Sequence, residues 1–92
     1  MKKKIAILGS TGSIGKTTFN IIKRNKKDFD IILLSTNRNT KILLKQAYLF
    51  NVKNLIITDK KKFLEIKNKL SKEKIKVFNN LENLDKIFKN KI

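Results

Sequence analysis

The chain has 92 residues, of which 40% are hydrophobic, and a formal net charge of +16. This length allows one small domain, and the apolar fraction fits a packed core rather than a disordered tail. The sequence contains neither cysteine nor histidine, which excludes disulfides, the usual zinc sites and histidine-based catalysis.

Apolar runs of strand length alternate with apolar residues at helical spacing along the whole chain. In chain order, the sequence predicts a strand over 4–8, a helix over 13–26, a turn over 28–30, a strand over 31–34, a polar loop over 35–39, a helix over 40–50, a strand over 55–57, a helix from about 59 to 70, a strand over 75–78 and a helix from 81 nearly to the last residue.

Several residues mark the helix faces and ends. The inward faces are predicted to carry Ile14, Phe19, Ile21 and Ile22, then Leu43, Leu44, Ala47, Tyr48 and Phe50, then Phe63, Ile66 and Leu70, and last Leu81, Leu84, Ile87 and Phe88. Side-chain oxygens that can cap helices precede or begin the helices, at Ser13, at Thr40 and at Thr58 or Asp59.

Four strand–helix pairs in a row predict an α/β fold of the Rossmann-like kind. We expect a parallel sheet of about four strands, joined by right-handed crossovers and covered by helices on both faces. Residues 1–92 form one domain in this prediction. The pattern stops on a helix where another parallel strand is expected, so the domain is predicted to be incomplete at its C-terminal end.

All three glycines of the chain fall in one loop, between the first predicted strand and the first predicted helix. Gly9 allows a tight turn, Gly12 lets the backbone approach a diphosphate, and Gly15 lets the helix pack closely. Thr11 and Ser13 add hydroxyl groups. The spacing predicts a dinucleotide site at a helix N-terminus, and the alternative is a glycine-rich turn with a packing role only.

A second nucleotide motif competes at the same residues. Gly15, Lys16 and Thr17 match the end of a phosphate-binding loop, but Gly9 stands six positions before Gly15, where that motif needs five. The extra residue changes how the backbone amides of the loop surround a phosphate, so a nucleoside triphosphatase is the less favoured interpretation.

The loop after the second predicted strand indicates which dinucleotide is bound. NAD sites usually place a carboxylate there, and residues 35–39 contain none. Arg38 offers a planar cation suited to a 2′-phosphate, and Ser35, Asn37 and Asn39 are able to donate hydrogen bonds to it as well. We therefore predict NADP(H), against the alternative that Arg38 is an ordinary surface cation.

Lysine supplies most of the positive charge. Among 23 basic residues only Arg24 and Arg38 are arginine, and the lysines are spread along the whole chain. A polyanion site more often groups arginine and lysine with exposed aromatic side chains. We expect no nucleic-acid partner, although a small basic module that binds nucleic acid stays an alternative. No apolar run approaches the about 20 residues that span a bilayer, so no membrane association is expected.

The run from Lys4 to Gly15, which contains Gly-Ser-Thr-Gly-Ser-Ile-Gly, closely resembles the opening of 1-deoxy-D-xylulose 5-phosphate reductoisomerases. The similarity continues through residues 18–25 and 34–39 to the helix with Leu44, Gln46 and Phe50, and weakens after Asp59. This family uses NADPH and a divalent metal, Mg²⁺ or Mn²⁺, to convert 1-deoxy-D-xylulose 5-phosphate to 2-C-methyl-D-erythritol 4-phosphate in non-mevalonate isoprenoid biosynthesis.

The resemblance implies cofactor contacts in two loops. They are Gly9, Thr11, Gly12, Ser13, Ile14 and Gly15 in the first loop, and Asn37, Arg38 and Asn39 in the second. Two positions depart from the family: it often has glycine at the position of Asn37, and a small or polar residue at that of Lys16.

The family's enzymes are several times longer than this chain, and their metal ligands, substrate contacts and catalytic lid follow the cofactor domain. No catalytic or metal-binding residue is therefore assigned among residues 1–92. The resemblance implies a fragment, inactive alone, of an enzyme that is homodimeric at full length. A cytoplasmic location is expected because no targeting segment is visible. An inactive gene remnant is a further alternative.

Overall fold

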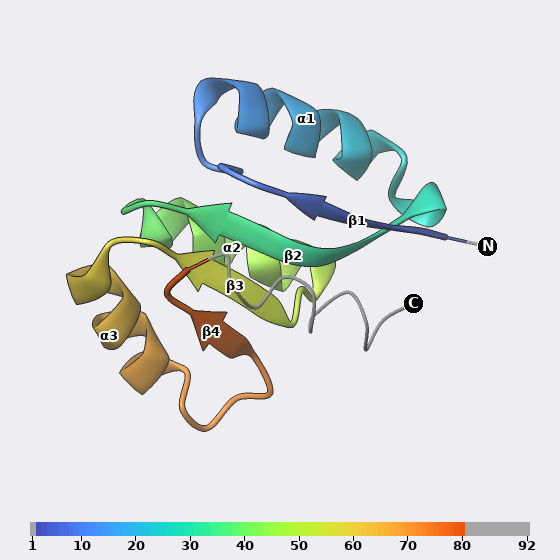
Figure 1. Cartoon of the computed structure of the whole chain (residues 1–92). Coiled ribbons are helices and arrows are strands. Elements are labelled where there is room, and N and C mark those ends of the chain that lie inside the picture. The colour runs from blue at the N-terminus through green and yellow to red at the C-terminus, as the bar shows by residue number, and fades with distance from the viewer. Residues whose placement is uncertain (1, 81–92) are drawn as a thin grey trace.

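The structure is a computed structural model and describes residues 2–80. Its elements are β1 (Lys3–Ile7), α1 (Ser13–Arg24), the 3-10 turn η1 (Lys26–Asp28), β2 (Phe29–Thr36), α2 (Thr40–Phe50), β3 (Asn54–Ile57), α3 (Lys60–Lys69) and β4 (Lys76–Phe78). The four strands form one parallel sheet in the order β1-β2-β3-β4 (Figure 1). The predicted α/β class and the four-stranded parallel sheet are confirmed.

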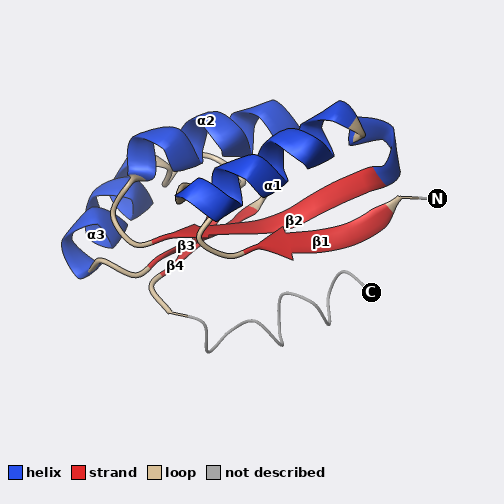
Figure 2. Cartoon of the chain, turned by 90° about the horizontal axis from the view of Figure 1, so that it is seen from above, coloured by secondary structure: helices blue, strands red, loops and turns tan. Residues whose placement is uncertain are grey.

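The three helices α1, α2 and α3 lie on the same face of the sheet (Figure 2). Each strand is added on the same side of the strand before it, and right-handed crossovers then turn every helix to one face. We predicted helices on both faces, and those within residues 2–80 cover only one. The helix predicted from Leu81 to Phe88 lies outside the described residues, so a helix on the second face stays a prediction.

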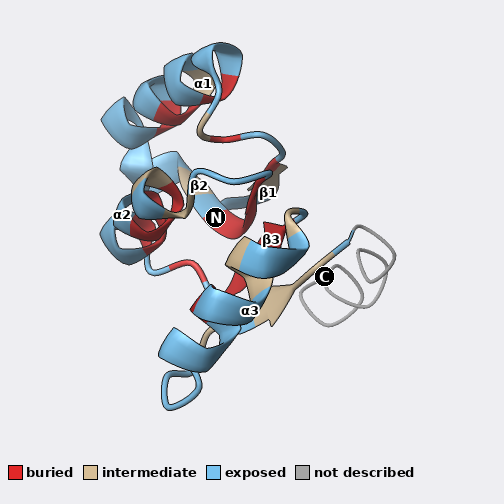
Figure 3. Ribbon diagram, turned by 90° about the vertical axis from the view of Figure 1, so that its left-hand side faces the viewer, coloured by how far each residue is buried: buried red, intermediate tan, exposed pale blue. Residues whose placement is uncertain are grey.

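The main core lies between the sheet and the helices (Figure 3). It brings together Phe19 and Ile22 of α1, Leu43, Leu44, Ala47 and Phe50 of α2, and Ile31, Leu34, Leu55 and Ile57 of the strands. Phe19 and Phe50 meet edge to face at 5.1 Å, which joins α1 to α2. A smaller cluster of Ile32, Leu33 and Ile56 lies on the opposite face. The consecutive residues Ile32 and Leu33 both belong to it, because the register of β1 against β2 shifts between Ile5 and Ala6 and interrupts the alternation there.

The second strand is longer than the apolar run that predicted it. β2 spans Phe29–Thr36, and its last residues Ser35 and Thr36 are buried although they are polar. Residues 28–30 are not a free turn, because Asp28 ends η1 and Phe29 already begins β2. The extension matters for the site, because β2 carries Ser35 and Thr36 up to the loop that follows β1.

Some residues on the predicted inward faces are exposed instead. Ile14, Ile21 and Tyr48 have exposed fractions of 84%, 55% and 54%. The first helix buries Gly15, Phe19 and Ile22, so its inward stripe is narrower than predicted. None of the helices among residues 2–80 is long and apolar enough to cross a membrane.

The helix caps are partly as predicted. Asp59 caps α3, since its side chain accepts a hydrogen bond of 3.0 Å from the Lys62 amide. Asn39, rather than Thr40, caps α2 by accepting from the Ile42 amide. For α1 the capping position is Gly12 rather than Ser13, and no side chain caps that helix.

Candidate functional site

The loops that follow β1 and β2 lie against each other at the carboxyl edge of the sheet. We call residues 8–12 the glycine loop and residues 37–39 the arginine loop. The Gly9 amide donates to Ser35 Oγ at 2.8 Å, and the Ser10 amide donates to the Ser35 carbonyl at 2.9 Å. The hydroxyls of Thr11 and Thr36 share a hydrogen bond of 2.6 Å. The end of β2 therefore supports the glycine loop immediately before the arginine loop begins.

The N-terminus of α1 is open. Its first three residues are Ser13, Ile14 and Gly15, and the first helical hydrogen bond runs from the Lys16 amide to the Gly12 carbonyl at 2.8 Å. The three preceding N–H groups have no acceptor within the helix. No side chain caps them and the first turn has no acidic residue. The partial positive charge of the helix end is therefore available to an anion.

The three glycines differ in what they do for the loop. Gly9 has a φ of +66°, which favours glycine. A Cβ on Gly15 would collide with the Gly9 carbonyl oxygen and lie 2.7 Å from the Ser10 Cα, so only glycine lets α1 start this close to the loop. A Cβ on Gly12 would meet only the Gly9 oxygen, at an ordinary 3.5 Å. The protein itself has room for a side chain at Gly12, and its absence leaves the helix end uncovered.

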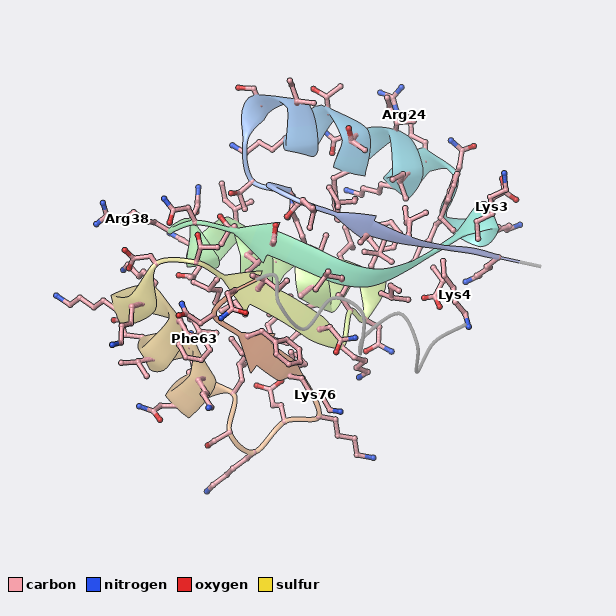
Figure 4. All side chains as sticks on the ribbon, viewed as in Figure 1. Lys3, Lys4, Arg24, Arg38, Phe63 and Lys76 are labelled. Atoms are coloured by element: carbon pink, nitrogen blue, oxygen red, sulfur yellow. The ribbon has the colours of Figure 1, made fainter. Side chains whose placement is uncertain are left out.

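The next loop along the sheet edge, which follows β3, holds the arginine loop. The Asp59 amide donates to the Asn37 carbonyl at 3.0 Å, and the Thr58 hydroxyl donates to Asn37 Oδ1 at 2.9 Å. Arg38 Nε lies 3.8 Å from Asp59 Oδ1. The guanidinium remains largely exposed and extends beyond the tip of β2 (Figure 4).

An open groove of about 750 Å³ lies between β1 and α1. Its lining is mainly apolar and includes Leu8 and Ile14, which are 52% and 84% exposed, beside Gly9, Gly12 and Ser13. The glycine loop thus has the charged arginine loop on one side and an apolar groove on the other. This arrangement can accept a ligand with an anionic centre, a polar anionic end and a flat, less polar end.

The structure brings all nine predicted site residues to this one edge of the sheet. Eight of them are at least partly exposed, whereas Gly15 is buried and acts through packing. The sequence analysis missed Ser10, which is buried within the glycine loop, Thr36, which is buried beneath it, and the pairing of Asp59 with Arg38. Ser35 was expected to donate to the phosphate, and in the structure it is buried and its Oγ accepts from the Gly9 amide. Within residues 2–80, no three side chains of the metal-ligating types come together.

A parallel sheet whose first strand leads through a glycine loop into an uncapped helix is a Rossmann-like α/β domain. The comparisons with known proteins make the assignment specific. The family model described as 1-deoxy-D-xylulose 5-phosphate reductoisomerase matches residues 5–92, and the chain belongs to this family. The resemblance predicted from the sequence is confirmed.

Similar proteins include the 1-deoxy-D-xylulose 5-phosphate reductoisomerase of Pelagibacter ubique (strain HTCC1062), which is 56% identical over 86 residues, covering 94% of this chain and 22% of that protein. The enzyme of the same name from Halothermothrix orenii is 37% identical over 84 residues, covering 91% of this chain and 22% of that protein. The chain therefore spans about a fifth of the length of these relatives.

Solved structures of the family share the fold. The Zymomonas mobilis reductoisomerase in complex with NADPH matches with a TM-score of 0.81 and 30% identity, over 95% of this chain and 23% of that one. A reductoisomerase in complex with NADPH, fosmidomycin and magnesium matches with a TM-score of 0.80 and 25% identity, over 92% of this chain and 21% of that one.

Proposed function

We propose that this chain is the NADPH-binding portion of a 1-deoxy-D-xylulose 5-phosphate reductoisomerase. The open N-terminus of α1, with Gly12 in front of it, is the observation that carries the proposal. A bare helix end is suited to a diphosphate, and a side chain at Gly12 would obstruct it without any benefit to the protein's own packing. The solved relatives in complex with NADPH support the choice of ligand.

In this proposal each part of the cofactor binds to a different segment at the carboxyl edge of the sheet. The diphosphate accepts hydrogen bonds from the amides of Ser13 and Ile14, with the Thr11 and Ser13 hydroxyls beside it. Arg38 contacts the 2′-phosphate, assisted by Asn37 and Asn39. The nicotinamide lies toward the apolar groove along β1. The nicotinamide supplies hydride when the cofactor is bound.

In this proposal the rest of the reaction needs parts of the enzyme beyond residues 1–92. We propose that the complete enzyme, a cytoplasmic homodimer, converts 1-deoxy-D-xylulose 5-phosphate to 2-C-methyl-D-erythritol 4-phosphate with Mg²⁺ or Mn²⁺. The acidic residues among 2–80 form no metal-binding group, so no step through a metal is assigned to them. Residues 1–92 alone bind cofactor and catalyse no turnover.

Calorimetric titration of the chain with NADPH and with NADH tests the proposal. We expect weak binding of NADPH, with a Kd on the order of 0.1–1 mM, because one sheet edge buries little of the ligand. NADH binds more weakly, since it lacks the 2′-phosphate. Absence of NADPH binding at several millimolar would contradict the proposed site. Turnover of deoxyxylulose phosphate by this chain alone would contradict the assignment as an inactive portion.

The nucleic-acid alternative is tested in the same buffers. Arg38 lies at one end of the molecule, whereas Arg24, Lys3 and Lys4 lie at the other (Figure 4), so the two arginines do not form one basic patch. A nucleic-acid-binding module would bind duplex or single-stranded DNA with an affinity that falls steeply as the salt concentration rises, and it would not bind NADPH. We expect the reverse preference at physiological ionic strength.

A further inference from the structure

A buried glutamine lies directly under the glycine loop. Gln46 belongs to α2, and its exposed fraction is 6%. The neighbouring inward positions of this helix carry the apolar residues Leu43, Ala47 and Phe50. Burying an amide among such side chains costs free energy unless its polar atoms are paired. The pairing of Gln46 is therefore informative about its role.

Both ends of the Gln46 amide contact the same residue of the glycine loop. Gln46 Nε2 donates to the Ser10 carbonyl at 2.9 Å, and Gln46 Oε1 accepts from Ser10 Oγ at 2.7 Å. The Ser10 amide donates to the Ser35 carbonyl, and Ser10 is completely buried. Across residues 2–80, no buried side-chain nitrogen or oxygen lacks a partner. All polar groups of Ser10 are thus held from two sides.

The position of Ser10 gives this contact a consequence beyond packing. Ser10 stands between Gly9, which has the left-handed backbone, and Thr11, which leads to the open end of α1. The helix that carries Gln46 is itself capped by Asn39 of the arginine loop. Gln46 therefore links the glycine loop to the helix that begins at the arginine loop, and fixes the spacing between the two predicted anion-binding segments.

We propose that Gln46 is a positioning residue for dinucleotide binding, which acts through Ser10 to hold the glycine loop with its amides open to the diphosphate. The inference rests on the proposed NADPH function for its ligand. Gln46 is buried beneath the loop, so it does not touch the cofactor. Its effect falls on the diphosphate, which NADPH and NADH share, whereas the effect of Arg38 falls on the 2′-phosphate.

The loop part of the proposal is tested on the free chain by amide hydrogen exchange. Gln46→Met keeps the side-chain length and removes both hydrogen bonds to Ser10, and Lys45→Met places the same residue at an exposed neighbouring position of α2. We expect Gln46→Met to accelerate hydrogen exchange of the Ser10 and Gly12 amides about tenfold more than that of the amides in β3. A factor of about ten corresponds to the net free energy of one hydrogen bond. Lys45→Met leaves both regions unchanged.

An equal acceleration in β3 would mean only a general loss of stability and would overturn the proposal, as would an unchanged loop. Ser10→Ala guards against a variant that does not fold. It removes the hydrogen bond from Ser10 Oγ to Gln46 Oε1, together with the longer one of 3.4 Å to the Ser35 carbonyl, and keeps the bond from Gln46 Nε2. We expect the same selective acceleration of the loop at a smaller factor, and an unselective or absent effect counts against the proposal.

The cofactor part is tested by phosphorus NMR, which resolves the diphosphate of NADPH from its 2′-phosphate. The unmodified chain perturbs both sets of signals, and Gln46→Met weakens binding of NADPH and NADH by the same factor, about tenfold. Equal affinity in the variant and the unmodified chain would overturn the positioning role. If the unmodified chain perturbs no signal, the NADPH function itself fails, while the exchange measurement still decides whether Gln46 holds the loop.

Discussion

Arg38 and Asp59 form an ion pair across two neighbouring loops, with 3.8 Å between Nε and Oδ1. The contact is made through the inner nitrogen of the guanidinium, and the Arg38 side chain extends away from the tip of β2 (Figure 4). The arginine is exposed and the aspartate is partly buried, so solvent screens the pair and it contributes little to stability. Its importance is geometric, because it places a carboxylate beside the cation that we assign to the 2′-phosphate.

Replacement of the arginine tests that assignment. We expect Arg38→Ala to weaken NADPH binding about tenfold, because a charge-assisted contact to phosphate is lost, and to leave NADH binding unchanged. Arg24→Ala is the matched control, since Arg24 lies exposed in the last turn of α1 at the opposite end of the molecule (Figure 4). Calorimetry with both cofactors measures the ratio. A parallel loss of NADH affinity would show that Arg38 does not read the 2′-phosphate.

Asp59 caps α3 and places a negative charge beside Arg38, and two substitutions separate these roles. Asp59→Asn keeps a side chain that caps α3 but removes the charge, so stability stays within about 0.5 kcal/mol. NADPH binding becomes up to about threefold tighter, since the repulsion between this partly exposed carboxylate and the 2′-phosphate is lost. Asp59→Ala also removes the cap and costs about 1 kcal/mol in urea unfolding. Weaker NADPH binding by Asp59→Asn would mean that the carboxylate orients Arg38 more than it repels the ligand.

The glycines provide a matched pair of substitutions. Gly12→Ala fits the protein's own structure, because the added Cβ meets only an ordinary contact. We expect its unfolding free energy to change by less than about 1 kcal/mol, while NADPH affinity falls more than about tenfold. Gly15→Ala instead forces α1 away from the loop, because its Cβ collides with backbone atoms, and it lowers stability and binding together. Undiminished NADPH binding by Gly12→Ala would exclude the helix end as the diphosphate site.

Tyr48 and Glu73 give a prediction at alkaline pH. The Tyr48 hydroxyl lies 3.3 Å from Glu73 Oε2, and partial burial, followed by the charge of Glu73, raises the pKa of Tyr48 above its usual 10.0. The folded chain therefore holds this proton to higher pH than the unfolded chain. The resulting stability is fully present below pH 10 and is lost as pH rises through the folded pKa.

The free energy of unfolding is measured at a series of pH values for the unmodified chain and for Tyr48→Phe. Because the lysines titrate in both proteins, their contribution cancels in the difference, which isolates the effect of the phenol. We expect the stability difference between the two proteins to be constant from about pH 6 to 9 and to change only above about pH 10. A difference that already varies near neutral pH would show that the phenol is not the group involved.

The sequence predicted the sheet and the candidate loops well, because both depend on short-range patterns. Apolar runs located all four strands, and the three glycines located the loop that leads into α1. The ends of β2 were missed because Ser35 and Thr36 are polar, and their burial is stabilised by hydrogen bonds to the glycine loop. Such partners lie about 25 residues away and leave no local signal.

The sequence analysis also placed Ile14 on the inward face of the first helix, where the structure leaves it exposed at the mouth of the groove. Five residues separate Ile14 from Phe19, a rotation of about 140° around a helix, so strict helical spacing already turns Ile14 away from the face of Phe19 and Ile22. Gln46 is the converse case, since a polar residue on an inward face has no explanation until Ser10 is found opposite it.

The place of β1 at the end of the strand order has a consequence for chemistry. In doubly wound sheets a dinucleotide lies in the crevice between two strands whose crossovers turn to opposite faces. The crossovers through α1, α2 and α3 all turn to one face of the sheet (Figure 2). Residues 2–80 therefore form only one of the two sides of such a crevice. The reactive ring of a nicotinamide held here would face water rather than a dry protein wall, and hydride transfer would lack the preorganised surroundings that accelerate it. In the proposed function, residues 2–80 are thus a platform that anchors the dinucleotide, and efficient hydride transfer needs a second protein wall against the ring.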